Sequence, residues 1–129
     1  MPHIDDLIDR LELVRFELSV ALAHESQLIS QSEIAIDHAL KATRAAAKAA
    51  QDVVNCKNAN ELAYLQLQSN EKAHYAQLFS AMSRDASELA SQAKQENAKI
   101  FMEIKKVAEL IALVLTEEQN VSSDSKSTG

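Results

Sequence analysis

Histidine, cysteine and glutamate are the residues of this sequence best suited to metal binding or nucleophilic catalysis. The pair His24-Glu25 begins like a zinc-protease motif, but Leu28 stands where that motif requires its second histidine. Glu71 and His74 form the single Glu-x-x-His spacing in the chain, whereas di-iron carboxylate bundles use two such pairs. We therefore predict no metal site.

Cys56 is the only cysteine of the chain, so it forms neither an intramolecular disulfide nor a cysteine-based zinc site. The sequence around it places no histidine or carboxylate in the pattern of a catalytic triad. The single glycine is the last residue, which excludes a glycine-rich phosphate-binding loop. We expect no catalytic residue, no cofactor-binding residue and no enzymatic activity.

The composition restricts the elements that such residues could occupy. The chain has 129 residues, 47% of them hydrophobic, but only one glycine and one proline. Sheets need frequent turn residues, so this scarcity excludes all-β and α/β folds and predicts an all-α protein. The net charge of −6 comes without a basic stripe, which argues against nucleic acid as a partner. We expect no transmembrane segment and a cytoplasmic protein, since the apolar runs are short.

The first predicted helix spans about residues 4–55. Its apolar residues recur at alternating steps of three and four, the heptad signature of a helix with one apolar seam. The register is interrupted only by Glu25 and Ser32. The seam residues are Ile4, Leu7, Leu11, Val14, Leu18, Ala21, Leu28, Ala35, Ala39, Ala42, Ala46, Ala49 and Val53.

This register stops at residues 55–60, which include three asparagines. Asparagine tolerates the left-handed conformation that ends helices, and it also caps the start of the next one. Asn58 and Glu61 have the spacing of a capping box. We predict a tight reversal here, with a hinge or kink as the alternative, so the chain is either a helical hairpin or an extended coiled coil.

The second predicted helix spans about residues 60–116 and is followed by a polar tail. Polar residues share its seam register at Ser69, Lys72, Ser83 and Asn97. Its apolar seam residues are Leu62, Leu65, Ala76, Phe79, Ala86, Ala90, Ala93, Ile100, Ile104, Val107, Ile111 and Val114. Residues 117–129 contain one aliphatic residue, so we expect a helical domain over 1–116 and a disordered tail over 117–129.

Both predicted helices carry more apolar residues than a two-helix seam can bury. The surplus residues are Leu22, Ile29, Ile36, Leu40 and Val54 in the first helix and Leu67, Leu78, Leu89, Leu110 and Leu113 in the second. Such a surplus must meet other copies of the chain or an apolar surface that is not protein. Our candidates for this apolar contact and oligomer stripe are Leu11, Leu18, Leu28, Leu62, Leu65, Phe79, Leu89 and Ile100.

The segment from Lys57 to Gln66 resembles a motif of the phasins, the proteins that coat polyhydroxyalkanoate storage granules in bacteria. The phasin pattern is Lys-Asp-x-x-Glu-Leu-x-x-Leu-Gln, and Asn58 replaces its aspartate here. The matching residues are Lys57, Glu61, Leu62, Leu65 and Gln66. The alanine-rich stretch 39–54 and the Arg84-x-x-x-Glu88-Leu-Ala pattern are also similar to that family.

The resemblance implies a helical, self-associating, non-catalytic protein that covers the polyester granule surface and controls granule size and number. Such a protein needs no cofactor, and it lies in the cytoplasm on the granule. The alternative reading of the same apolar residues is a coiled-coil scaffold or a chaperone-like module that binds other proteins.

Overall fold

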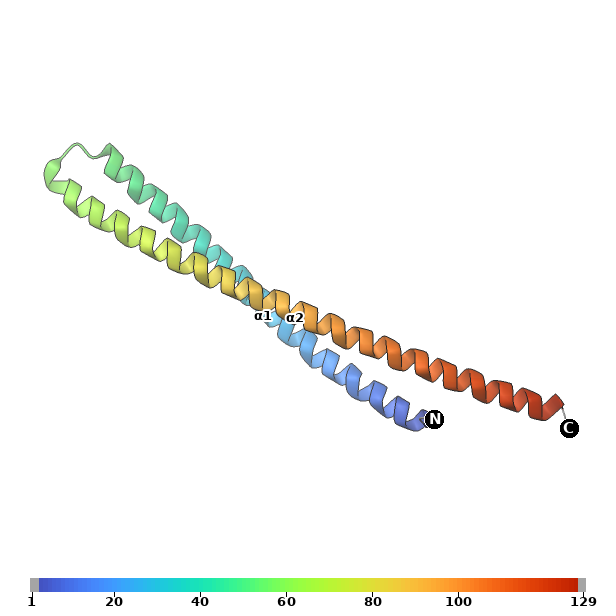
Figure 1. Cartoon of the computed structure of the whole chain (residues 1–129). Coiled ribbons are helices and arrows are strands. Elements are labelled where there is room, and N and C mark those ends of the chain that lie inside the picture. The colour runs from blue at the N-terminus through green and yellow to red at the C-terminus, as the bar shows by residue number, and fades with distance from the viewer. Residues whose placement is uncertain (1–2, 128–129) are drawn as a thin grey trace. The chain divides into compact units, whose positions relative to one another are not determined.

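The chain folds into two long α-helices. The computed structural model describes residues 3–127, with side chains up to residue 121. Helix α1 spans Ile4–Asn55 and helix α2 spans Ala59–Ser127, and the described range contains no strand (Figure 1). The all-α prediction is confirmed, and the observed bounds of α1 equal the predicted ones.

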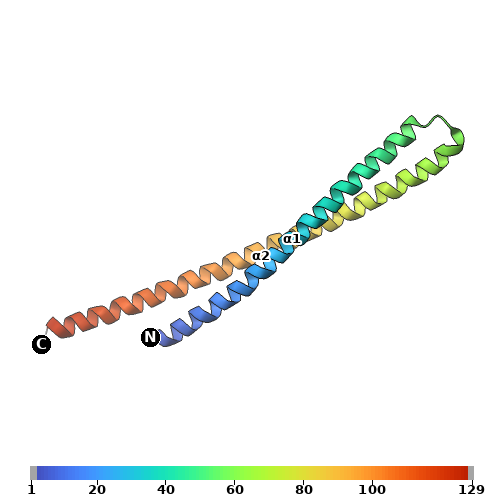
Figure 2. The same cartoon turned by 180° about the vertical axis from the view of Figure 1, so that it is seen from behind.

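Each helix contributes to two compact units. The terminal unit comprises residues 1–24 of the chain with residues 93–129, and the hairpin unit comprises residues 25–92. The view from behind in Figure 2 shows that in each unit one segment of α1 runs beside one segment of α2.

The two helix segments are antiparallel in both units. In the terminal unit, Arg10 contacts Glu103, and Ala21, further along α1, contacts Asn97, which is earlier in α2. In the hairpin unit, Ser32 contacts Ser87, and the ring of His38 lies 5.9 Å from that of Phe79. Residue numbers therefore rise along α1 as those of their partners fall along α2.

The reversal between the helices takes only three residues, Cys56 to Asn58. Asn58 caps α2, because its Oδ1 accepts a hydrogen bond of 2.9 Å from the Asn60 amide and its carbonyl accepts from Glu61 and Leu62. This confirms a tight reversal capped by Asn58. No described residue has a positive φ, so α1 ends without the left-handed residue that its asparagines allow.

Replacing Asn58 with alanine is expected to destabilise the protein by about 1 kcal/mol, because the Asn60 amide loses its side-chain acceptor. Thermal unfolding followed by circular dichroism measures the change. Asn60→Ala is the matched control at the exposed second position of the same helix, and we expect it to cause no loss. Equal effects of the two substitutions would refute the capping role.

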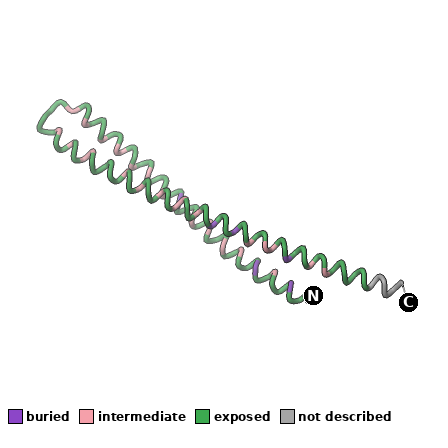
Figure 3. The backbone as a smooth tube through the Cα atoms, in the orientation of Figure 1, coloured by how far each residue is buried: buried purple, intermediate pink, exposed green. Residues whose placement is uncertain are grey.

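Every apolar residue of both predicted seams is buried or half-buried. The fully buried hydrophobic residues are few, however, and all lie in the terminal unit: Leu7, Val14, Ala93 and Val107. Figure 3 shows how little of the backbone carries buried side chains. Lys72 is the one predicted seam position that is exposed, since its ammonium group stays in water.

Two polar residues of the seam are buried and have hydrogen-bond partners. The hydroxyl oxygens of Ser32 and Ser87 lie 3.0 Å apart, and the Asn97 side-chain amide donates to the carbonyl of Ala21 across 3.2 Å. Buried polar groups are tolerated when they are paired in this way. These polar positions of the seam are therefore inter-helix contacts and not breaks in the pairing.

Packing between the helices ends near the predicted boundary at residue 116, although α2 itself continues to Ser127. Among the side chains described, Val114 is the last that is half-buried, and residues 115–121 are all exposed. The backbone continues as helix because residues 117–127 include no proline or glycine. The predicted disorder of residues 117–129 stays a prediction; residues 128–129 and the side chains of 122–127 lie outside the described part.

Candidate apolar surface

The largest chemical feature of the described residues is exposed hydrocarbon. Among large hydrophobic side chains, 22 are exposed, whereas only Leu7, Val14 and Val107 are buried. All ten surplus residues named from the sequence are among the exposed ones. The most exposed of these ten are Val54 at 77%, Leu67 at 63% and Leu113 and Leu89 at 59% and 53%.

The solvent-accessible area of the chain is also larger than that of a compact protein of its mass. The chain exposes 9752 Å², whereas a compact monomer of 14.2 kDa exposes about 6,800 Å² by the usual scaling with mass. The excess of roughly 3,000 Å² exceeds the area that a standard protein interface buries. The chain therefore offers ample surface for a further contact.

Heptad positions show where this surface lies on each helix. With Ile4 and Leu62 at position a, the e positions of the two antiparallel helices share one flank of the seam and the g positions share the other. Arg10 and Glu103, both at g, form an ion pair of 2.9 Å. Leu22 and Phe101, both at e, line one groove. The two flanks are thus distinct surfaces.

In the terminal unit, the e flank is mostly apolar on both helices. Its exposed large hydrophobic residues are Ile8 and Leu22 from α1 and Phe101 and Leu115 from α2, and its charged residues are Arg15 and Lys94. An open groove of about 310 Å³ on this flank is lined mainly by apolar atoms of Leu18, Leu22, Phe101 and Ile104, with Arg15 and Ser19 at its edge. The g flank is mostly polar, apart from Leu110, with its g positions at Arg10, Glu17, His24, Glu96 and Glu103.

A second apolar stripe of the terminal unit lies on the side of α1 that faces away from α2. Leu13, Phe16 and Val20 occupy positions c, f and c and are 59%, 67% and 55% exposed. A shallow hollow of about 360 Å³ lies beside Phe16 and Val20 and extends to His24. Our sequence interpretation missed this stripe, although steps of three and four from Leu13 to Val20 are its signal.

In the hairpin unit, each flank is apolar on one helix only. Ile29 and Ile36 of α1 lie on the e flank, whereas Tyr75, Met82 and Leu89 of α2 lie on the g flank. The polar groups that complete the e flank are those of Gln66, Ser80 and Ser87, and those that complete the g flank include Gln31, His38 and Asp52.

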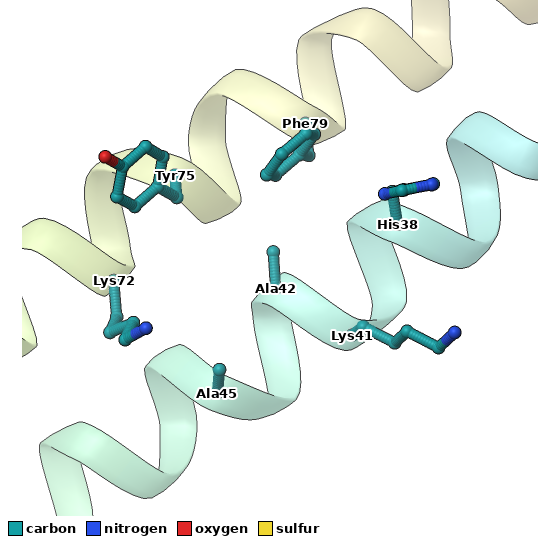
Figure 4. A pocket seen from close by; sticks show the side chains of 7 residues that line it. All are labelled: His38, Lys41, Ala42, Ala45, Lys72, Tyr75 and Phe79. Atoms are coloured by element: carbon teal, nitrogen blue, oxygen red, sulfur yellow. The ribbon is translucent and has the colours of Figure 1, made fainter.

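A groove of about 410 Å³ opens on the g flank of the hairpin unit. Its apolar floor is formed by Ala42 and Ala45 of α1 opposite Tyr75 and Phe79 of α2 (Figure 4). Figure 4 shows His38 and Ala42 on the side of α1 that faces Phe79. The small alanine side chains leave this space beside the seam.

One of the two lysines at this groove, Lys41, has an acidic partner on its own helix. The Lys41 ammonium lies 2.9 Å from Asp37, and this ion pair and hydrogen bond hold the pKa of the Asp37 carboxyl below its ordinary value. Asp37 therefore stays ionised at neutral pH.

The structure separates the candidate stripe residues into two groups. Seven are half-buried in the seam: Leu11, Leu18, Leu28, Leu62, Leu65, Phe79 and Ile100. Leu89 is the one that is exposed, at position g. The seven seam residues therefore contact the other helix. The surface that is free for a further contact consists of the e and g flanks and the outer stripe of α1.

The phasin-like motif residues gather at the turn and the first turns of α2. Lys57, Glu61 and Gln66 are exposed, whereas Leu62 and Leu65 belong to the seam. Lys57, Glu61 and Leu65 border a shallow depression with Asp52 and Cys56. The motif residues therefore form the turn and the start of α2, and two of them also contribute to the seam between the helices.

The described residues with catalytic or metal-binding side chains form no metal-binding cluster. In the described part of the chain, no three histidine, cysteine, aspartate or glutamate side chains are placed to hold a metal ion. His24, Glu71 and His74 are exposed, and the Cys56 thiol donates a hydrogen bond to the Asn58 carbonyl at 3.1 Å. The Cys56 thiol is thus part of the turn.

Across residues 3–127, neither helix contains a stretch that is long and apolar enough to cross a bilayer. A comparison with protein-family models, curated proteins and solved structures finds no match for this chain. The apolar surface and the resemblance of residues 57–66 are therefore the two features that point to a function.

Proposed function

We propose that this protein is a non-catalytic, amphipathic coat that binds the surface of polyhydroxyalkanoate storage granules, self-associates there, and controls granule size and number. The observation that carries the proposal is the set of 22 exposed large hydrophobic side chains on a pair of helices. Its location is then the granule surface in the cytoplasm, and the similarity of residues 57–66 to phasins supports the same assignment.

The binding energy comes from apolar area and not from a pocket. An aliphatic polyester presents an apolar face, and covering a leucine or isoleucine side chain completely contributes about 1.5–3 kcal/mol. A dozen half-exposed side chains then hold the protein firmly without a hot spot. The e flank of the terminal unit suits this contact, because both helices contribute hydrocarbon to it.

The charge of the chain explains why coated granules stay apart. With 19 acidic and 13 basic residues, each molecule adds a net charge of −6 to the particle surface. Like charges repel over about 10 Å at 0.1 M salt. A covered granule therefore resists coalescence.

The test measures partition of the full chain onto poly(3-hydroxybutyrate) particles by co-sedimentation, at low and at moderate salt. We expect binding that moderate salt does not reverse, because the contact is apolar and the protein is acidic. Sedimentation equilibrium without particles is expected to show oligomers. A fixed oligomer that ignores the particles would refute the coat and favour the coiled-coil scaffold or chaperone-like module.

A chain that ends at Thr116 is expected to bind the particles as the full chain does, within about twofold. Residues 117–121 are exposed, and Val121 is the only large hydrophobic side chain among them, so the removed segment contributes little apolar area. The same co-sedimentation assay provides the comparison. Loss of binding on this truncation would place the contact in the tail.

A further inference from the structure

The hairpin unit cannot present all its exposed hydrocarbon to one flat surface while its helices are paired. Ile29 and Ile36 project on the e flank, whereas Tyr75, Met82 and Leu89 project on the g flank. In an antiparallel pair these flanks lie on opposite sides of the seam. A particle that touches one flank therefore leaves the apolar residues of the other flank in water.

On each helix taken alone, the exposed hydrocarbon is continuous with the seam. Ile36 and Leu40 border the seam residue Ala39 on α1, and Met82 and Leu89 border Phe79 and Ala86 on α2. Each helix thus has one broad apolar face, of which its partner covers only a part. Separated helices could lay both complete faces on the same surface.

The seam of the hairpin unit is weak. Within residues 25–92, all of which the structure describes, Ser32 is the only buried residue. The α1 side of this seam is mostly alanine, from Ala35 to Ala49, and alanine buries only one methyl group. Polar residues, including Lys72 and Ser83, occupy seam positions on α2.

Separation also breaks few hydrogen bonds. Backbone bonds of an α-helix close within the helix, so they survive when the two helices part. In residues 25–92, the Ser32–Ser87 bond of 3.0 Å is the only side-chain hydrogen bond between the helices. The three-residue turn at 56–58 connects the two segments and can act as the hinge.

We propose that the hairpin unit opens at the turn when it meets an apolar surface, so that the inner seam faces of α1 and α2 become the contact with polyester. This inference rests on the proposed function and adds a second contact surface to the e flank of the terminal unit. The terminal unit stays paired, because it holds Leu7, Val14, Ala93 and Val107 in its core and has an e flank that is mostly apolar on both helices.

The test is a reversible covalent closure of the hairpin unit. Ser32→Cys and Ser87→Cys, introduced together with Cys56→Ser, place two thiols where the hydroxyl oxygens are 3.0 Å apart, close to the bond length of a disulfide of about 2 Å. The matched control closes the terminal unit through Ala21→Cys and Asn97→Cys in the same Cys56→Ser background. Thiol titration verifies closure, and circular dichroism verifies helicity.

Each protein is bound to poly(3-hydroxybutyrate) particles before and after reduction. We expect oxidation of the 32–87 pair to weaken binding about tenfold or more, with recovery on reduction, since several side chains lose their contact. Oxidation of the 21–97 pair is expected to leave binding within about twofold. Equal binding by the oxidised and reduced 32–87 protein would overturn the opening.

The design separates this inference from the proposed function. Failure of the reduced proteins and of the unsubstituted chain to bind polyester refutes the coat function itself. In that case, the opening of the hairpin unit is tested by binding to hexadecane droplets, an apolar surface without ester groups. Weaker droplet binding by the oxidised 32–87 protein supports it, and equal or absent binding by both forms overturns it.

Discussion

Replacing Ile8, Leu22, Phe101 and Leu115 together with serine is expected to reduce the affinity for polyester particles by about a thousandfold. These side chains are 41%, 46%, 59% and 46% exposed. Covering the exposed half of each contributes about 1 kcal/mol, so that four lost contacts amount to about 4 kcal/mol. Co-sedimentation with poly(3-hydroxybutyrate) particles over a range of protein concentrations measures the affinity.

The control for this variant removes four exposed polar side chains from the same unit. Serine at Glu12, Lys99, Lys105 and Glu109 leaves the net charge unchanged and removes no large apolar side chain. We expect helicity to persist in both variants and binding to persist in the control. If one of the four apolar substitutions alone abolished binding, the contact would be a specific site and not a spread apolar surface.

Val107→Asp is expected to lower the free energy of unfolding by about 4 kcal/mol, because it places a carboxylate at the most buried position of the terminal unit. Val107 is 1% exposed, and the fully buried hydrophobic core has only three further residues. Urea unfolding followed by circular dichroism gives the change. We expect the helical signal to be lost at much lower urea than in the unsubstituted protein.

Leu113→Asp provides the comparison on the same helix, six residues further along. Leu113 is 59% exposed, so its substitution is expected to change the free energy of unfolding by about 0.5 kcal/mol or less. A similar loss for both substitutions would show that helix propensity, and not burial, dominates the effect. The pair therefore tests whether the small core of the terminal unit stabilises the fold.

The proposed function and the proposed opening both follow from how little two helices can bury. Each helix segment has one neighbour within its unit, and a seam takes only two of every seven residues. Larger hydrophobic residues at e, g, c and f positions then stay in water, as Phe16, Leu67 and Phe101 do. A fold of this kind is suited to surfaces that supply the missing apolar neighbour.

The sequence alone determined the two helices, the break between them and the residues of the seam, but it left open whether the chain reverses at that break. Helices depend on local hydrogen bonds and on side-chain spacing, so steps of three and four predicted α1 from Ile4 to Asn55. The lack of proline and glycine left residues 55–60 as the one break, and Asn58 caps α2 there. Because the seam positions follow from side-chain spacing, the apolar residues outside the seam could also be identified from the sequence.

Only the tertiary structure decided which of the free apolar residues lie together. Leu22 of α1 and Phe101 of α2 line one groove, and the spacing within either helix does not show this. The e and g positions of the two helices also form shared flanks only when the helices are paired. That pairing joins residues such as Arg10 and Glu103, which are 93 positions apart, and local periodicity carries no information about the register between such distant segments.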